Sequence, residues 1–338
     1  MEPDLLHHGD AEIAPHLADF AVNVRLTAPP PWLADVITAT TATLGHYPRP
    51  AAAIAAVARR HQRPADQVLL TAGGAEAFTL LARALTPRQA VIVHPQFTEP
   101  EAALLTAGHP VTRVLLQASD GFLLHPDLVP EGADLVVIGN PTNPTGTLHP
   151  ADLIRGLIRP GRVVVVDEAF IDAVPGESES LAAQQVPGLL VIRSLTKTWG
   201  LAGLRAGYLL AAAPLVALLA TAQPRWAVSA PALRATELCC APPAVAQAAA
   251  WANLLRGERA RLVADLAAVT GVTVAPDPRG PFVLIRTDRV ELWNPLRDKG
   301  FAVRRGDTFA GLGPAWIRVA VRDRDTSTAF VDALRSVS

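Results

Sequence analysis

The sequence predicts an α/β protein: a large domain with a mostly parallel, seven-stranded sheet sandwiched by helices, and a smaller α+β domain built from the chain ends. Three observations predict this fold. The 338 residues are 50% hydrophobic, which is enough to bury a large core and allows two domains. Short apolar runs alternate with helical segments from residue 68 onward. These runs are continuously apolar, as in a sheet that helices cover on both faces.

The chain begins with a proline-rich stretch that has little helical periodicity. We expect an extended arm here, with a short helix at residues 32–44. An alanine-rich helix is predicted next, at residues 50–62. The seven predicted strands of the large sheet follow at residues 68–70, 90–93, 112–116, 135–138, 163–166, 189–192 and 207–210. Ligands of such sheets bind beyond the ends of the strands, so polar residues there are candidates for a functional site.

The C-terminal third predicts the smaller domain. After a helix at residues 214–221, we expect a long helix, three strands and a terminal helix, at residues 244–269, 272–274, 282–285, 316–319 and 326–334. We therefore divide the chain into an arm at residues 1–45 that adds part of the small domain, a large domain at 46–225 and a small domain at 226–338. No low-complexity linker separates the two domains, so we expect them to pack closely.

Lys197 carries the strongest functional signal. It follows the predicted buried strand at residues 189–192, where an ammonium without a partner costs several kcal/mol. The chain has two lysines against 28 arginines, so we expect this lysine to be needed as an amine. Ser194, Thr196 and Arg205 flank it with groups that suit a phosphate. An amine beside an anion site predicts pyridoxal phosphate, held by Lys197 as a Schiff base.

Two other interpretations of Lys197 were weighed. Residues 194–197 also match the S-x-x-K motif of serine acyl-transferring enzymes, in which the serine is the nucleophile. Those enzymes need a further Lys-Thr-Gly strand, whereas Lys299 lies in Asp-Lys-Gly. A lysine exposed after a strand is the simpler alternative, and the phosphate-binding character of the neighbouring residues argues against it.

Other predicted strands also end in polar groups. Residues 71–76 form a glycine-rich turn into a helix, and such a turn offers free N–H groups to an anion. Asp167 follows a fully apolar strand, and a protonated pyridine nitrogen would give its carboxylate a positive partner. Arg318 lies within another apolar run and favours a bidentate anion, with a structural ion pair as the alternative.

These motifs resemble those of pyridoxal-phosphate enzymes of the aspartate aminotransferase superfamily, which is aminotransferase class I/II of fold type I. The resemblance rests on residues 194–207, on Asn-Pro-Thr-Asn-Pro-Thr-Gly at residues 140–146 and on Asp167, and it extends from His8 to Arg322. It implies an enzyme in which Lys197 and Asp167 are catalytic.

The resemblance also implies roles for individual residues. Backbone N–H groups of Gly74 and Ala75 would bind the cofactor phosphate, together with Ser194, Thr196 and Arg205. Phe97 would stack on the pyridine ring, and Asn143 would donate to its phenolic oxygen. Phe170 stands where most aminotransferases have a tyrosine, which removes one hydrogen bond to that oxygen.

Two branches of the superfamily resemble this chain: histidinol-phosphate aminotransferases and the threonine-phosphate decarboxylases of cobalamin synthesis. Both act on phosphorylated amino compounds, and both use a tyrosine of a Tyr-Pro pair, here Tyr47, to reach the cofactor phosphate of the partner subunit. A homodimer is therefore implied. Arg318 and Arg304, with Asn23, are assigned to the anionic groups of the substrate.

Four features favour the decarboxylase branch. They are His8-Gly9, Asp19-Phe20-x-x-Asn23, the run from Asp167 to Asp172, and Gly-Leu-Gly at residues 311–313 before Arg318. The N-terminal match is imperfect because Asp10 replaces a second glycine. We predict decarboxylation of L-threonine O-3-phosphate to (R)-1-amino-2-propanol phosphate. The alternative is transamination of histidinol phosphate or a related amino acid.

Composition excludes several other classes of function. The net charge of −1 and the scattered arginines predict neither a nucleic-acid nor a membrane partner. Cys239 and Cys240 are adjacent, so they have neither metal-ligand spacing nor a useful disulfide geometry, and we expect no metal and a reducing, cytoplasmic setting. A signal peptide is not predicted. A regulator with an aminotransferase-like domain would need a basic DNA-binding segment, which the first 45 residues do not provide.

Overall fold

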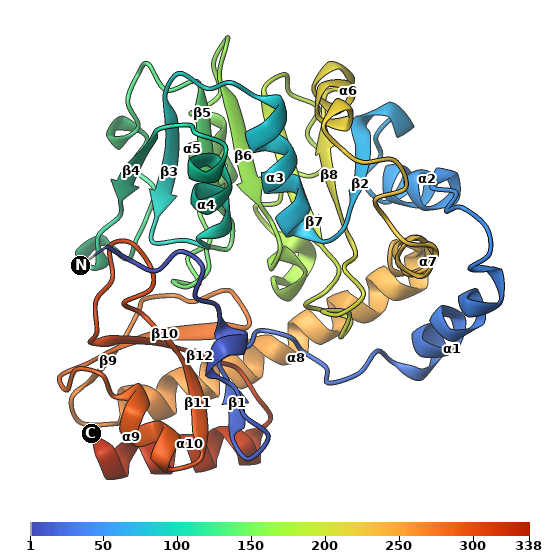
Figure 1. Ribbon diagram of the computed structural model, residues 1–338. Helices are drawn as coiled ribbons and strands as arrows, with labels where there is room; N and C mark the ends of the chain where they lie inside the picture. The colour runs from blue at the N-terminus through green and yellow to red at the C-terminus, as the bar shows by residue number, and fades with distance from the viewer. Residues whose placement is uncertain (1) are drawn as a thin grey trace.

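The computed structural model describes residues 2–338, and within them the larger sheet has seven strands in the order β2-β8-β7-β6-β5-β3-β4 (Figure 1). Among these strands β8 runs antiparallel to both of its neighbours, as the prediction of a mostly parallel sheet allows. The predicted strands are confirmed as β2 (Val68–Thr71), β3 (Ala90–His94), β4 (Val111–Leu115), β5 (Leu135–Gly139), β6 (Val163–Asp167), β7 (Leu189–Ser194) and β8 (Gly207–Ala211).

Both faces of this sheet are covered by helices, which explains why its strands are apolar throughout. One face packs against α3 (Gly74–Ala84), α4 (Glu99–Thr106) and α6 (Ala213–Thr221). The other face packs against α2 (Ala51–Arg60), α5 (Ala151–Arg155) and α7 (Ala230–Cys239). Successive residues of β6 alternate between the two cores, since Val164 and Val166 join one and Val165 joins the other.

The smaller sheet has the order β1-β11-β12-β10-β9 within the described residues. Its strands are β1 (Ala18–Phe20), β9 (Val272–Val274), β10 (Phe282–Thr287), β11 (Phe301–Arg305) and β12 (Trp316–Ala320). β1 pairs in parallel with β11, so the N-terminal segment completes a sheet that is otherwise built from the C-terminus. This agrees with the predicted α+β domain built from the chain ends.

Three helices pack on the smaller sheet or connect it to the larger one. α8 (Pro242–Ala267) is a long helix that runs from beneath the larger sheet to the smaller one, where α9 (Trp293–Asp298) and α10 (Arg324–Val337) also lie (Figure 1). Phe20, Leu262 and Phe330 belong to the core between these helices and the sheet. The small domain thus has a core of its own, while Ala275 and Leu284 also pack into one core of the large domain and join the two.

The remaining elements are short. The predicted helix at residues 32–44 divides into α1 (Pro31–Ala39) and a 3₁₀ turn, and α7 packs against both α1 and α2. The 3₁₀ turns are η1 (Gly9–Glu12), η2 (Thr40–Thr43), η3 (Ala65–Gln67), η4 (Ala118–Asp120), η5 (Pro126–Leu128), η6 (Ile171–Ala173) and η7 (Pro175–Glu177).

Within residues 2–338, no single helix is both long and apolar enough to cross a membrane, while α7 and α8, bent by 70°, pass that test as a pair. The predicted cytoplasmic location stays a prediction.

Candidate active site

A cavity of about 420 Å³ lies where the carboxyl ends of the large-domain strands face the small domain. The structure places nearly all of the predicted site residues around it: Asn23, Gly74, Ala75, Phe97, Asn143, Asp167, Phe170, Ser194, Thr196, Lys197, Arg205, Arg304 and Arg318. Tyr47 is the predicted site residue that does not line it. Residues separated by up to 295 positions in sequence thus meet at one place, as the strand-end argument predicted.

Lys197 and Asp167 give the cavity an amine and a carboxylate. Burial lowers the pKa of Lys197 to about 8, and the positive charges of Arg205 and Arg318 act in the same direction. Burial raises the pKa of Asp167 to about 6, although the backbone N–H of Ala169 donates to its Oδ1 at 3.0 Å. A cation placed against Asp167 would reverse this shift, so the carboxylate is suited to a positively charged ligand.

The turn between β2 and α3 forms an anion site with the lysine loop. Gly73 precedes α3 with φ of 78°, and a Cβ there would lie 2.6 Å from Nη2 of Arg205. Hydroxyl groups at the end of β7 lie close by, because the oxygens of Ser194 and Thr196 are 2.8 Å apart. N–H groups at a helix N-terminus, two hydroxyls and a guanidinium together match a phosphate.

Arg318 and Arg304 reach the cavity from strands of the small domain. Arg318 donates from Nη1 to Asn143 Oδ1 at 2.5 Å and from Nη2 to the carbonyl of Ala21. Arg304 donates from Nη2 to the carbonyl of His7 at 2.5 Å. Burial lowers the pKa of Arg318 well below its usual value and that of Arg304 to about 10, so both guanidinium groups are poorly solvated.

Several buried polar atoms of residues that line this cavity have no partner within residues 2–338. They are Nη1 of Arg304, Nε of Arg318, and both side-chain polar atoms of Asn23. Buried donors left without a partner are costly, and unsatisfied guanidinium N–H groups favour an anionic ligand. The assignment of these residues to substrate anions stays a prediction, and this arrangement supports it.

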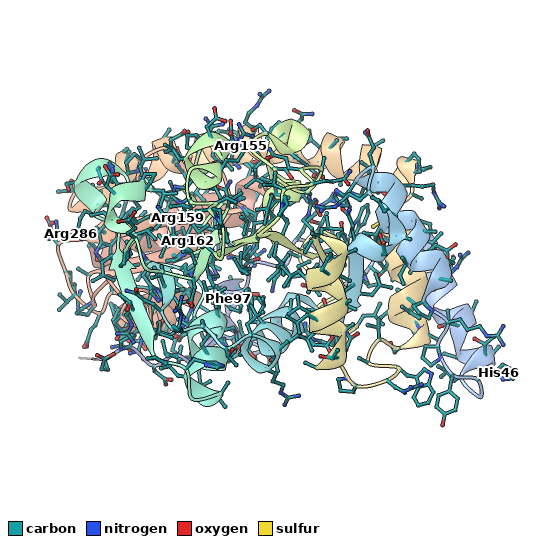
Figure 2. All side chains as sticks on the ribbon, turned by 90° about the horizontal axis from the view of Figure 1, so that it is seen from above. His46, Phe97, Arg155, Arg159, Arg162 and Arg286 are labelled. Carbon is teal, nitrogen blue, oxygen red and sulfur yellow. The ribbon has the colours of Figure 1, made fainter. Side chains whose placement is uncertain are left out.

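Two aromatic residues line the cavity in different ways. Phe97 follows β3 and points toward the middle of the molecule, with its ring 5.6 Å from that of His8 (Figure 2). Phe170 follows β6 and packs edge-on against Phe282 at 5.0 Å. The ring of Phe170 carries no hydroxyl, so it supplies no hydrogen bond to a ligand in the cavity.

Tyr47 lies outside this cavity, 71% exposed, and its ring stacks on Trp226 at 4.2 Å. His46, its neighbour in the chain, lies at the edge of the molecule and far from Phe97 (Figure 2). Tyr47 therefore does not line the cavity of its own subunit, and its contact with a partner's cofactor stays a prediction.

His149, which the sequence did not single out, contacts Asn140 and Thr142 in the loop that carries Asn143. Its Nδ1 accepts from the backbone N–H of Leu124 at 3.2 Å, and its Nε2 lies 3.1 Å from Thr142 Oγ1. Burial lowers its pKa to about 4, so the ring is neutral at pH 7. The Asn140 side chain bonds both the N–H and the carbonyl of His149, at 2.8 and 3.1 Å. These contacts hold the loop that carries Asn143, and no feature of the sequence indicated them.

His8, Asp10 and Glu99 also line the cavity, with His8 Nε2 2.6 Å from Glu99 Oε1. The sequence singled out His8 and Asp10 as part of a motif but not Glu99. Across residues 2–338, three or more His, Cys, Asp or Glu side chains do not gather into a cluster that could hold a metal ion.

This chain is similar to known proteins over most of its length. Residues 16–334 match the family described as aminotransferase class I and II. A protein of Mycobacterium tuberculosis named histidinol-phosphate aminotransferase is 49% identical over 94% of this chain and 86% of its own length. A threonine-phosphate decarboxylase of Salmonella typhimurium is 33% identical over 83% of this chain and 80% of its own length.

Among solved structures, the histidinol-phosphate aminotransferase from Clostridium acetobutylicum superposes with a TM-score of 0.86. The match covers 94% of this chain and 98% of the other, at 23% identity, and it shows a shared fold.

Proposed function

Because this chain belongs to the aminotransferase class I and II family, whose cofactor is pyridoxal 5′-phosphate, we propose that it transforms a phosphorylated amino compound, with transamination as the first candidate reaction. The observation that carries this proposal is the meeting of Lys197, Asp167, Asn143 and Arg205 around one cavity. They supply an amine, a carboxylate, an amide and a guanidinium, which are the groups that this cofactor requires.

The residues present fit the cofactor. The concave turn at Gly73, which a Cβ would fill, and the hydroxyls of Ser194 and Thr196 would hold its phosphate. Asp167 would face the pyridine nitrogen, because its raised pKa calls for a cation. Phe97 lies on the cavity wall as a stacking partner, and Asn143 would donate to the phenolic oxygen.

Once bound, the cofactor supplies an electron sink for the pair released at Cα of the substrate. The chain's own residues decide which bond at Cα breaks. Lys197 lines the cavity as an amine whose pKa is lowered to about 8, so it can take or return a proton at Cα near neutral pH. Arg304 and Arg318 would bind the anionic groups of the substrate and so orient it. Arginine contacts that leave the Cα–H bond free to react would favour transamination, and contacts that place the Cα–carboxylate bond in the reacting position would favour loss of carbon dioxide.

Relatives support transamination better than the decarboxylation that the sequence motifs favoured. The relative named as an aminotransferase is 49% identical, and the one named as a decarboxylase is 33% identical. The four motifs that favour decarboxylation are short, and identity over most of the chain carries more weight than they do. We therefore propose histidinol phosphate, or a close analogue, as the first substrate to examine.

Decarboxylation of L-threonine O-3-phosphate is the second candidate, and Phe170 is the observation that favours it. Its ring provides no hydroxyl near the cofactor site and packs instead on Phe282. The paired arginines Arg304 and Arg318, each with an unpartnered N–H, also suit a substrate with two anionic groups.

We further propose a homodimer in which Tyr47 reaches the cofactor phosphate of the partner subunit. The exposure of Tyr47 and its distance from its own cavity support this arrangement.

A parallel assay tests the two reactions. Purified protein with pyridoxal phosphate is given histidinol phosphate and 2-oxoglutarate, and separately L-threonine O-3-phosphate, with Lys197→Ala as control. Glutamate formation by the wild type, absent from the variant, is the expected result. Carbon dioxide and the amine product from the second substrate would instead establish the decarboxylase. An inactive wild type in both assays would contradict the proposed substrates.

A further inference from the structure

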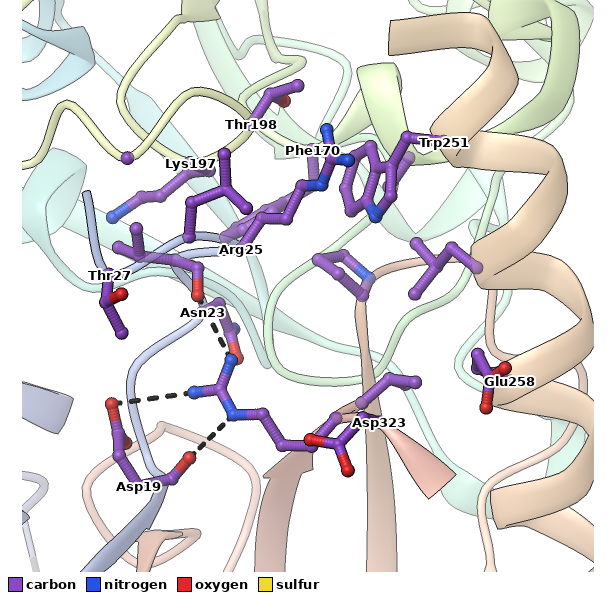
Figure 3. Close-up of a pocket in the computed structure, with 18 of the residues that line it drawn as sticks. Asp19, Asn23, Arg25, Thr27, Phe170, Lys197, Thr198, Trp251, Glu258 and Asp323 are labelled. Carbon is purple, nitrogen blue, oxygen red and sulfur yellow. Dashed lines mark hydrogen bonds and ion pairs between the residues drawn. The ribbon is translucent and has the colours of Figure 1, made fainter. Parts of the chain in front are cut away.

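The segment from β1 to Arg25 forms a wall between two cavities. One is the candidate active site, and the other is a cavity of about 930 Å³ on the far side of the segment. Asn23, Val24 and Lys197 line both cavities, so the segment passes directly beside the lysine (Figure 3). Its position therefore determines the shape of the active site.

Arg322, just after β12, holds this segment by its backbone. Its three nitrogen positions donate to three different carbonyls: Nε to Asp19 at 2.7 Å, Nη2 to Val22 at 2.7 Å and Nη1 to Val24 at 3.1 Å. The Arg322 side chain is 17% exposed, and the carboxylate of Asp19 lies 3.5 Å from its Nη2. A planar guanidinium can bond several carbonyls at fixed angles, whereas a lysine ammonium is a single point of charge.

This arrangement presents Asn23 to the active site. Arg322 binds the carbonyls on either side of it, those of Val22 and Val24. The side chain of Asn23 lines the cavity, and neither its Nδ2 nor its Oδ1 has a partner in the described part of the chain. An amide held this way is ready to bind a ligand without first breaking a bond within the protein.

The far end of the segment contacts the lysine loop. The backbone N–H of Arg25 donates to the carbonyl of Lys197 at 2.9 Å. The guanidinium of Arg25 lies 4.8 Å from the centre of the Trp251 ring on α8, which fixes this end of the segment against the helix. Arg322 is therefore linked, through one short stretch of backbone, to both Asn23 and Lys197.

We propose that Arg322 is a positioning residue that holds the segment of residues 19–25 so that Asn23 faces the substrate and the Arg25 N–H supports the Lys197 loop. The role of Arg322 in presenting Asn23 to the substrate rests on the proposed function. Its role in holding the backbone of residues 19–25 is independent of that function. These two parts of the proposal are tested separately.

Amide hydrogen exchange tests the backbone part on the holoenzyme. The variants are Arg322→Lys, which keeps the charge, and Arg322→Gln, with Arg324→Gln as the control because Arg324 is exposed two residues away. We expect peptides covering residues 19–28 to exchange about tenfold faster in both Arg322 variants, with β5 and β6 unchanged. Unchanged exchange in this segment, or an equal increase throughout the protein, would overturn the proposal.

A double-mutant cycle with Asn23→Ala tests the substrate part. Arg322→Lys is expected to raise KM for the amino substrate about tenfold, a loss typical of hydrogen bonds to a charged group. Adding Arg322→Lys to Asn23→Ala should raise KM no further, because Arg322 acts through Asn23. Additive effects would overturn this step. If the wild type converts neither candidate substrate, the proposed function fails while hydrogen exchange still decides the role of Arg322.

Discussion

Arg318 and Asn143 join the two domains through a hydrogen bond of 2.5 Å between Nη1 and Oδ1. One residue belongs to β12 of the small domain, and the other to the loop after β5 of the large domain. The bond occupies the acceptor of Asn143 and leaves its Nδ2 to donate into the cavity. Under the proposed function, Arg318 would thereby affect both the substrate and the group that would contact the cofactor's phenolic oxygen.

Arg318→Lys should therefore lose more than one interaction. A lysine ammonium is a compact point charge and cannot reproduce the planar fork with which Arg318 bonds Asn143 and Ala21, so we expect kcat/KM to fall about a hundredfold. Steady-state kinetics measure this effect, with Arg335→Lys on the exposed face of α10 as the control. A loss below about threefold would show that Arg318 does not bind the substrate.

Asp167→Asn should stabilise the cofactor-free protein at pH 7 and weaken cofactor binding. The folded-state pKa of Asp167 is raised from 3.8 to about 6, so the native state binds more protons between these values and loses stability as pH rises through them. Removing this ionisation should add about 3 kcal/mol to the free energy of unfolding at pH 7 and less than about 1 kcal/mol near pH 4.

Thermal and urea unfolding of the cofactor-free proteins at both pH values measure that difference. Titration with pyridoxal phosphate measures the second effect. Destabilisation of the cofactor-free variant at pH 7 would contradict the raised pKa.

The strands of the large sheet could be predicted because burial on both faces leaves an unbroken apolar run, as in β6. β1 and β11 could not be predicted in the same way. β1 has three residues, which is too short for a recognisable pattern. β11 ends in Arg304 and Arg305, and these charged residues interrupt the apolar run that would indicate a strand. Tertiary pairing, rather than local sequence, defines both.

Some residues of the candidate site could be predicted because a charged side chain after a buried strand indicates a specific chemistry. The amine of Lys197 and the carboxylate of Asp167 are examples. Supporting contacts could not be predicted, because they depend on how distant segments meet. His149 contacts Leu124 through a backbone N–H, and Arg322 contacts three carbonyls of the N-terminal segment. Backbone groups are the same at every position, so the sequence carries no sign of such partners.

His149→Gln should change the pH dependence of stability. The pKa of His149 is lowered from 6.5 to about 4, so its favourable neutral form is fully present above pH 6.5 and its contribution is lost as pH falls toward 4. Wild type should be more stable than the variant by about 1–2 kcal/mol at pH 7, and this advantage should be lost or reversed at pH 4.5, where the linkage contribution falls by about 2 kcal/mol.

Urea unfolding at the two pH values measures this change. His125→Gln, at an exposed histidine, is the matched control. A stability difference between wild type and His149→Gln that does not vary with pH would mean that the ring is not buried in its neutral form.

Gly207→Ala should weaken cofactor binding by deforming the phosphate turn. A Cβ at residue 207 would lie 2.8 Å from the carbonyl carbon of Gly73 and 3.0 Å from the nitrogen of Gly74. We expect a tenfold or greater rise in the dissociation constant for pyridoxal phosphate, on the order of 1.4 kcal/mol or more. Gly257→Ala, in the open middle of α8, has no atom within 4 Å of its new Cβ and should leave affinity unchanged. Equal effects from both substitutions would refute this reasoning.

Tyr47 provides a test of the homodimer through hybrid dimers. If Tyr47 acts on the partner's cofactor, a dimer of one Tyr47→Ala subunit and one Lys197→Ala subunit contains one site with both residues intact. The isolated hybrid should then recover about half of the wild-type activity, whereas both parent variants are impaired.

A hybrid of Lys197→Ala with Asp167→Ala is the control, because each site keeps one defect and no recovery is expected. The two differently tagged subunits are co-expressed and the hybrid is purified through both tags. Failure of the Tyr47 hybrid to exceed its parents would place Tyr47 outside the partner's site. Its exposed ring, stacked on Trp226, would then have to be explained by a local packing role.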